Sequence, residues 1–188
     1  VNEEFNKYVE EHSSTEPEIL KELFRDTHIK MINPRMISGC QQSHLLRLLV
    51  RLKKPHRALE IGTFTGYSAL SIGMELPDQA LLYTIEVNEE NEDLIQTYIQ
   101  KADLLSKIKL LIGNALDIIP TLNEKWDLVF IDGNKEEYHE YFDLIADNIN
   151  PGGLVIVDNI LWSGKVLIPN ELENDKSTKT IDSFNKRI

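Results

Sequence analysis

The sequence has one cysteine, Cys40, among its 188 residues, so an internal disulfide is excluded. It also lacks any run of 18 or more apolar residues, the length that a membrane-spanning helix requires. Residues 1–18 are polar and acidic and do not resemble a secretory signal or a transit peptide. No cysteines and histidines have the spacing of a zinc site. We therefore expect a protein of the reducing cytoplasm with no membrane segment.

Positive charge is scarce as well. The net charge of −11 opposes general attraction to nucleic acid or to anionic lipid. The cationic cluster at residues 47–57 is better explained as the solvated face and end of a helix. A hydrophobic content of 41% in 188 residues is enough for the core of one globular domain, so we expect a single domain over residues 1–188.

Helical periodicity dominates the N-terminal part, residues 1–56. Residues 16–31 carry apolar side chains at helical spacing, and Asn33-Pro34 breaks the pattern. Residues 38–52 predict a further helix. Its buried side would carry Leu45, Leu46, Leu48, Leu49 and Leu52.

From residue 57 onward, short β-rich runs alternate with helical segments. The runs are residues 57–61, 81–87, 107–113, 126–132 and 152–159, and the helical segments are 66–76, 89–102, 114–121 and 135–149. The runs are too apolar to have a wet face, which is typical of parallel strands covered on both sides. The pattern predicts an α/β fold with a doubly wound, mostly parallel sheet over residues 57–188. Residues 168–178 predict a polar loop before a last helix.

Acidic residues stand at the ends of four of these runs: Glu60, Glu86, Asp132 and Asp158. Sheets of this kind bind ligands beyond the carboxyl ends of their strands, so the four carboxylates share the expected ligand side.

The first of these strand ends leads into a glycine loop, "EIGTFTGYS". The loop is not G-x-G-x-x-G, so the dinucleotide fingerprint is absent. Glu60 would repel a phosphate and favours a ligand with an ammonium or sulfonium. Glu86 suits the ribose hydroxyls of a nucleoside, although it could instead cap the helix at 89–102. A ligand with a cationic end and a ribose is S-adenosylmethionine.

Four motifs, "LEIGTFTGYSAL", "TIEVNEE", "FIDGNK" with Tyr138, and "DNILWSGKV", resemble the cation-dependent O-methyltransferases, the family of the catechol and caffeoyl-CoA O-methyltransferases. The resemblance runs from about residue 31 to the end of the chain. It implies a Rossmann-like methyltransferase fold with extra N-terminal helices, which could form a homodimer. Relatives continue into an antiparallel strand pair after the last helix, and we expect this pair to be missing here. The cofactor-binding positions it implies are Met36, Ser38, Glu60, Gly62, Phe64, Gly66, Ser68, Glu86, Val87, Asn114, Ala115 and Asp132.

A metal site is expected where the fourth and fifth runs end. Neighbouring strand ends lie roughly 5 Å apart, so Asp132, Asp158 and Asn159 could meet around one ion. Two carboxylates and an amide oxygen suit Mg²⁺, and Mn²⁺ or Ca²⁺ could use the same donors. An Asp-Asn pair at a strand end is also common in ordinary turns. The resemblance to the family favours metal binding over that alternative.

The same resemblance assigns catalysis and acceptor binding. It makes Lys135 the general base, with Asp132 beside it, and places Trp162 and Lys165 at the acceptor site. A nearby dication and a sulfonium would disfavour the charged form of Lys135. Lys135 could instead be a solvated residue at the start of a helix, and Trp162 could instead be a core residue.

The leading interpretation is a Mg²⁺-dependent O-methyltransferase that acts on a catechol-like or other metal-chelating hydroxyl of a small aromatic molecule. The main alternative keeps the chemistry and takes 5-hydroxyuridine at the wobble position of tRNA, which the acidic charge disfavours. A nicotinamide-dependent oxidoreductase is disfavoured by the missing fingerprint. A non-catalytic binding module is disfavoured by the combination of Asp132, Lys135, Asp158 and Asn159.

Overall fold

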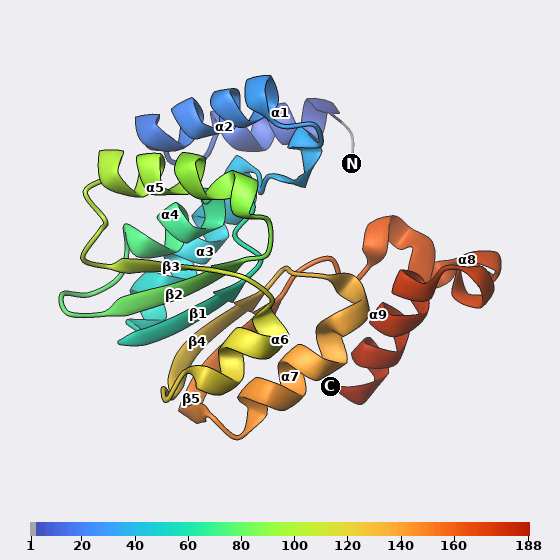
Figure 1. Cartoon of the computed structure of the whole chain (residues 1–188). Helices are drawn as coiled ribbons and strands as arrows, with labels where there is room; N and C mark the ends of the chain where they lie inside the picture. Colours follow the sequence, from blue (N-terminus) through green and yellow to red (C-terminus); the bar gives the residue numbers. More distant parts are fainter. Residues whose placement is uncertain (1–2) are drawn as a thin grey trace.

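The computed structural model describes residues 3–188, and a five-stranded parallel sheet forms its centre (Figure 1). The strand order is β3-β2-β1-β4-β5. The strands are β1 (Arg57–Ile61), β2 (Leu81–Glu86), β3 (Ile108–Ile112), β4 (Trp126–Ile131) and β5 (Ile149–Val157). The predicted doubly wound α/β sheet is therefore confirmed.

Helices cover both faces of this sheet (Figure 1). One face carries α3 (Cys40–Lys53), α4 (Tyr67–Gly73) and α5 (Glu92–Lys101), with α2 (Glu18–Lys30) packed outside α4. The other face carries α6 (Ala115–Ile118), α7 (Tyr138–Ala146) and α9 (Lys176–Arg187). The remaining α-helices are α1 (Glu3–Glu11) and α8 (Pro169–Asn174), and the 3₁₀ turns are η1 (Pro34–Met36), η2 (Glu89–Asn91), η3 (Ile119–Thr121), η4 (Lys135–Glu137) and η5 (Trp162–Leu167). Within residues 3–188, every helix is too short or too polar to cross a bilayer.

Strand alternation divides the core into two layers. In β1, Ala58 packs with the helices of the α3–α5 face, whereas Leu59 and Ile61 pack with those of the α6–α7 face. The period of two places Glu60 on the same side as Ala58. β1 pairs with both β2 and β4, so the strand order reverses at its carboxyl end, where ligands bind in sheets of this type.

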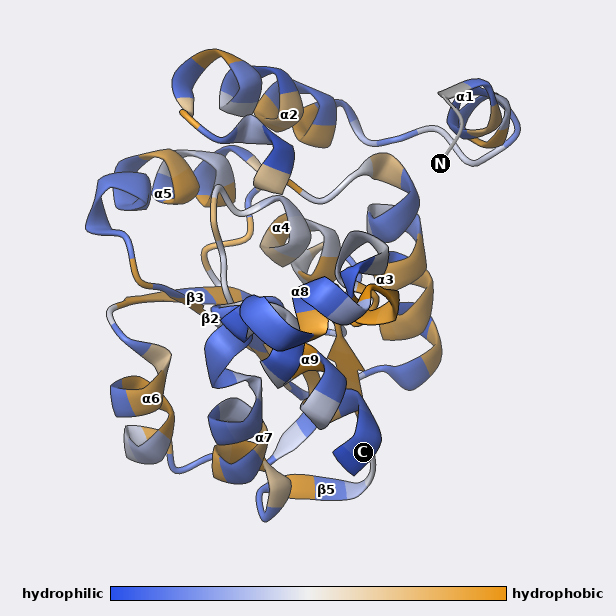
Figure 2. Cartoon of the chain, turned by 90° about the vertical axis from the view of Figure 1, so that its right-hand side faces the viewer, coloured by the Kyte–Doolittle hydropathy of each residue, from blue (hydrophilic) through white to orange (hydrophobic). Residues whose placement is uncertain are grey.

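The predicted buried side of α3 is wrong in part. Leu46 is buried, but Leu45, Leu48 and Leu52 are 53%, 53% and 73% exposed. The buried stripe is Ser43, Leu46 and Val50, at helical spacing, and Ser43 Oγ bonds Ser71 Oγ of α4 at 2.8 Å. A stripe this narrow cannot contain all five leucines, and hydrophobic segments of α3 remain on its outer side (Figure 2).

The predicted loop at residues 168–178 is also wrong, because it contains α8 and the start of α9. Pro169 opens α8 at a position where a proline costs no helical hydrogen bond. The side chain of Asp175 accepts a hydrogen bond from the backbone nitrogen of Thr178 and caps α9. The segment therefore folds as a short helix and the start of a longer one, and both helices contact η5.

Candidate active site

A cleft of about 960 Å³ opens beyond the carboxyl ends of the central strands. Its volume lies in the range of small-molecule sites. Most predicted site residues line it: Met36, Ser38, Gly62, Phe64, Ser68, Glu86, Val87, Asp132, Lys135, Asp158, Asn159, Trp162 and Lys165. Four others are not among its lining residues: Glu60, Gly66, Asn114 and Ala115.

Three of these four residues belong to the starts of helices. Gly66, with φ +94°, is the residue directly before α4 and ends the glycine loop. The side chain of Asn114 accepts a hydrogen bond from the backbone nitrogen of Leu116 at 2.9 Å and caps α6. Ala115 follows it and is buried. Asn114 and Ala115 therefore begin a helix on the other face of the sheet, and a contact of theirs with a cofactor stays a prediction.

The glycine loop passes very close to the end of β4. Gly62 has φ +99°, and its backbone nitrogen donates to Ile85 O at 3.0 Å. A Cβ on Gly62 would lie 2.5 Å from the carbonyl oxygen of Asp132. Glycine is thus required here by both the backbone angle and the approach of a neighbouring backbone.

Glu60 is fully buried directly before this loop. Its Oε2 accepts a hydrogen bond from Thr84 Oγ1 at 2.5 Å, and its Oε1 makes no hydrogen bond within the described chain. Burial raises the pKa of the Glu60 carboxyl to about 8, although the Ser68 hydroxyl is near enough to oppose this shift. A buried acceptor without a partner, next to a glycine that opens on the cleft, fits a ligand that brings a cationic donor.

Glu86 joins the glycine loop to the end of β2. Its Oε2 accepts from the backbone nitrogen of Phe64 at 2.6 Å, and its Oε1 accepts from that of Asn88 at 2.9 Å. The cap of the following helical turn is Asn88, whose side chain accepts from the nitrogen of Glu90 at 3.1 Å. Burial raises the pKa of the Glu86 carboxyl. Oε1 also accepts a longer hydrogen bond from Asn91 Nδ2 at 3.4 Å, so Oε2 is the oxygen with a lone pair left for a ligand hydroxyl.

Asp132 and Asp158 continue the hydrogen-bond ladders of β4 and β5. The backbone nitrogen of Asp132 donates to Ile61 O at 2.9 Å, and that of Asp158 donates to Ile131 O at 3.0 Å. The pKa of the Asp132 carboxyl is raised above its ordinary value, and burial is the main cause. The ammonium of Lys135 opposes this shift, and the charge of Asp158 adds to it. The charge of Asp158 therefore acts on the Asp132 carboxyl, and both side chains line one cleft.

Asn159 completes the predicted donor set. It is exposed, has φ +58°, and its backbone nitrogen donates to Asp158 Oδ1 at 2.6 Å. Across residues 3–188, no group of three or more His, Cys, Asp or Glu side chains is placed to hold a metal ion. The set here has two carboxylates and an amide, hard oxygen donors of the kind that Mg²⁺ prefers.

Lys135 turns back toward the end of β4. Its Nζ lies 2.6 Å from Asp132 Oδ1 and 3.0 Å from Gly133 O, and the side chain is 14% exposed. The geometry has a local cause, because the side chain of Asn134 caps the turn η4 through the backbone nitrogen of Glu136 at 3.2 Å. Lys135 is therefore an ion-paired amine in the cleft wall and differs from a solvated lysine.

Residues of η5 and of the start of α9 line one side of the cleft. Trp162 Nε1 donates to Asp175 Oδ2 at 3.3 Å, and Lys165 Nζ lies 3.0 Å from Glu171 Oε2. Positive φ at Trp162, Ser163 and Gly164 turns the chain sharply a few residues after Asp158 and Asn159. Trp162 and Lys165 therefore line the cleft, with their polar atoms engaged by α8 and the cap of α9.

Several residues line the cleft but were not predicted from the sequence, among them Gln42, Asn134 and Ser177. Asn134 had a signal, since it stands between Asp132 and Lys135 in "FIDGNK". Gln42 had none, because its contact with Asp158 joins residues 116 positions apart. Ser177 lies in a segment that the sequence predicts as a loop.

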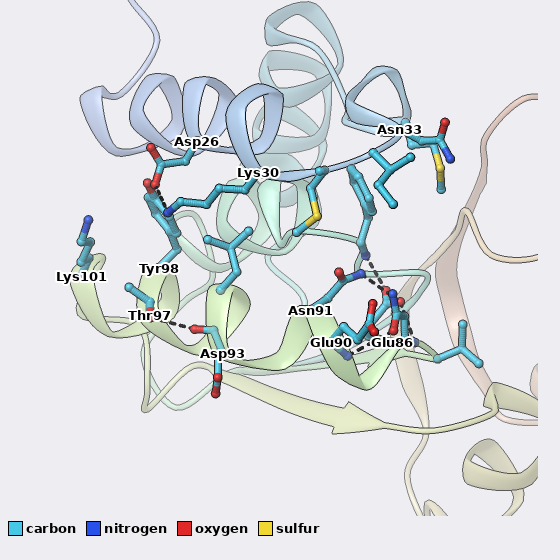
Figure 3. A pocket seen from close by; sticks show the side chains of 17 residues that line it. Asp26, Lys30, Asn33, Glu86, Glu90, Asn91, Asp93, Thr97, Tyr98 and Lys101 are labelled. Carbon is cyan, nitrogen blue, oxygen red and sulfur yellow. Dashed lines mark hydrogen bonds and ion pairs between the residues drawn. The ribbon is translucent and has the colours of Figure 1, made fainter.

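A second hollow of about 800 Å³ lies between α2 and α5 (Figure 3). The Asp26–Lys30 ion pair and Tyr98 stand at one end and Glu86 at the other. It shares Met36, Phe64, Glu86 and Val87 with the main cleft. The hollow is therefore a lateral extension of that cleft under residues 31–36.

Solved structures define the class to which this fold belongs. The O-methyltransferase TomG from Streptomyces achromogenes, in complex with SAM, has a TM-score of 0.90 and 31% identity over 98% of this chain and 83% of its own. An O-methyltransferase from Bacillus cereus in complex with SAH has a TM-score of 0.89 and 27% identity over 97% of this chain and 83% of its own. The fold is the Rossmann-like fold of S-adenosylmethionine-dependent methyltransferases.

Sequence similarity places the chain more narrowly. The O-methyltransferase family profile matches residues 10–188, so the chain belongs to the O-methyltransferase family. Caffeoyl-CoA O-methyltransferase 2 from Petunia hybrida is 34% identical over 160 residues, which cover 82% of this chain. The match spans 66% of the length of that enzyme.

Proposed function

We propose that this chain catalyses the S-adenosylmethionine-dependent, divalent-metal-dependent O-methylation of a small aromatic molecule with a catechol-like or other chelating hydroxyl. One observation carries the proposal: a single cleft holds the Lys135–Asp132 pair together with Asp158 and Asn159. Relatives with SAM or SAH bound, and a relative named for caffeoyl-CoA methylation, support the same chemistry.

The cofactor supplies an electrophilic methyl group on a sulfonium. Glu60 and the backbone at Gly62 would hold its ammonium, since Glu60 Oε1 is buried without a partner and Gly62 opens the cleft. Glu86 would accept from a ribose hydroxyl with the lone pair of Oε2 that the bond from Phe64 leaves free. Met36, exposed and shared by both hollows, would cover the bound nucleoside.

The metal would be held by Asp132, Asp158 and Asn159. A divalent cation lowers the pKa of a hydroxyl that it contacts and fixes the position of a chelating acceptor. Lys135 Nζ is the counter-ion of Asp132, at 2.6 Å from Oδ1. A cation bound by both Asp132 and Asp158 would replace Lys135 as that counter-ion. Lys135 would then be released from its ion pair.

Lys135 Nζ is the general base that takes the hydroxyl proton of the substrate to be methylated. The Lys135 ammonium would first release a proton to water, and its neutral amine would then take the hydroxyl proton as the acceptor oxygen forms its bond to the methyl carbon and the carbon–sulfur bond breaks. The sulfonium becomes a neutral thioether, the acceptor becomes a methyl ether, and Lys135 leaves the step as an ammonium. Holding oxygen, methyl and sulfur in line is the main contribution of the site, because methyl transfer depends mostly on position.

A methyl-transfer screen tests this function. The protein is incubated with S-adenosylmethionine and Mg²⁺ and a catechol, an acyl-CoA phenolic or hydroxyuridine-containing tRNA, and S-adenosylhomocysteine formation is measured. We expect turnover with an aromatic vicinal diol, its loss in EDTA and its return with added Mg²⁺. Turnover with tRNA alone would replace the proposed acceptor, and full turnover in EDTA would refute the metal requirement.

A further inference from the structure

Gln42 connects the N-terminal helices to the proposed metal site. It lies in the first turn of α3, which begins at Cys40 after Gly39. Its Nε2 donates a hydrogen bond to Asp158 Oδ2 at 2.8 Å, and the side chain is partly buried in the cleft wall. The neighbouring face of α3 is fixed in the core by Ser43 and Leu46. Gln42 therefore reaches Asp158 from a rigid element.

The Asp158 carboxylate is held from two directions. Gln42 binds Oδ2, and the backbone nitrogen of Asn159 binds Oδ1 at 2.6 Å. The Asp158 backbone is fixed by Ile131 O at 3.0 Å and by Tyr138 Oη, which donates to Asp158 O at 3.1 Å. Removing the Gln42 bond would leave a fixed backbone and a carboxylate that is free to rotate.

These bonds leave Asp158 able to bind a cation. An ionised carboxylate has about four lone-pair sites, and the two hydrogen bonds use two of them. Gln42 is neutral and donates from its amide, so it orients the carboxylate without cancelling its charge. A carboxylate that ligates a metal is commonly oriented by such a hydrogen bond, and loss of the partner weakens metal binding about 10–100-fold.

We propose that Gln42 is a positioning residue for divalent-cation binding, acting through the Asp158 carboxylate. The inference rests on the proposed function, because it requires a cation at Asp132, Asp158 and Asn159. It adds a group from α3, outside the strand ends, to the determinants of metal affinity.

Mn²⁺ titration of the metal-free protein, followed by the electron paramagnetic resonance signal of free Mn²⁺, tests the inference. Gln42→Met keeps the side-chain length and removes the donor, and Gln42→Asn keeps the amide on a shorter stem. Gln41→Met is the matched control, since Gln41 is the preceding residue of the same helix and is exposed, and its Nε2 donates to Asn6 Oδ1 at 3.4 Å. The Kd for S-adenosylhomocysteine without metal is measured for every variant.

We expect both Gln42 variants to raise the Kd for Mn²⁺ at least about 10-fold, with Gln41→Met within about twofold of the original protein. The Kd for S-adenosylhomocysteine should stay within about twofold in all. Unchanged Mn²⁺ affinity in the Gln42 variants overturns the inference and leaves the metal proposal standing. If the Gln42 variants lose Mn²⁺ and S-adenosylhomocysteine binding equally, Gln42 only supports the fold, and the inference is again overturned. An original protein that binds no Mn²⁺ overturns the metal proposal, and the inference with it.

Discussion

The buried carboxyl of Glu60 predicts a dependence of stability on pH that one substitution should remove. Its pKa is raised from 4.5 to about 8 in the folded protein, and burial is the main cause. Between these two values the folded state holds a proton that the unfolded state has released. The contribution of Glu60 to stability is therefore full below pH 4.5 and is lost as the pH rises through 8.

The size follows from the shift. Each pKa unit corresponds to about 1.4 kcal/mol, so Glu60 alone should lower the free energy of unfolding by about 2.5 kcal/mol between pH 5.5 and pH 7.5. Glu60→Gln keeps the shape, cannot ionise, and can still accept from Thr84. The difference in unfolding free energy between the original protein and the variant should therefore change by that amount.

Urea unfolding at the two pH values measures this difference, with Glu89→Gln on the surface as a control for the loss of a carboxyl. The control difference should be the same at both pH values to within about 0.5 kcal/mol. A Glu60→Gln difference that is equally constant would refute the reasoning, because Glu60 would then titrate alike in both states.

Three further substitutions test the site. Lys135→Met should lower kcat about 10²–10⁴-fold by removing the proton acceptor, with the Kd for S-adenosylhomocysteine unchanged in a calorimetric titration; an equal loss of cofactor binding would make Lys135 a structural residue. Gly62→Ala should lower the free energy of unfolding by at least about 2 kcal/mol, because its Cβ would meet Asp132 O at 2.5 Å, whereas Gly152→Ala, also at positive φ but with open space around it, should cost less. Similar losses at both glycines would show that the backbone angle, and not the contact, is decisive. Asp158→Asn keeps the size and removes a charge, so the Mg²⁺ concentration for half-maximal turnover should rise at least about 10-fold, and an unchanged value would exclude Asp158 as a ligand.

The convergence of Asp132, Lys135 and Asp158 could be predicted from the sequence. Buried parallel strands all end at one edge of the sheet, so a carboxylate directly after each strand must lie on that edge. The close contact between Gly62 and Asp132 follows from the same topology. These features depend on local periodicity and on one general rule of sheet architecture.

The exposed leucines of α3 and the role of Gln42 could not be predicted in this way. Leu45 and Leu48 have the residue type of a core, and only the packing of α3 on α4 decides which side is buried. The Gln42–Asp158 bond depends on the rotation of α3 about its axis and on its distance from β5, which no local pattern encodes. Glu60 could be predicted in part. Strand alternation fixes the face of the sheet on which its side chain lies, but not that its Oε1 is left without a hydrogen bond.

The central claim is that Asp132, Asp158 and Asn159 hold a divalent cation in the cleft that also binds the nucleoside cofactor. A crystal structure with S-adenosylhomocysteine and Mn²⁺, recorded at the manganese absorption edge, tests it most directly. The account predicts one anomalous peak within about 2.3 Å of oxygen atoms of all three side chains, with Lys135 separated from Asp132. Bound S-adenosylhomocysteine without a peak at these side chains would contradict it.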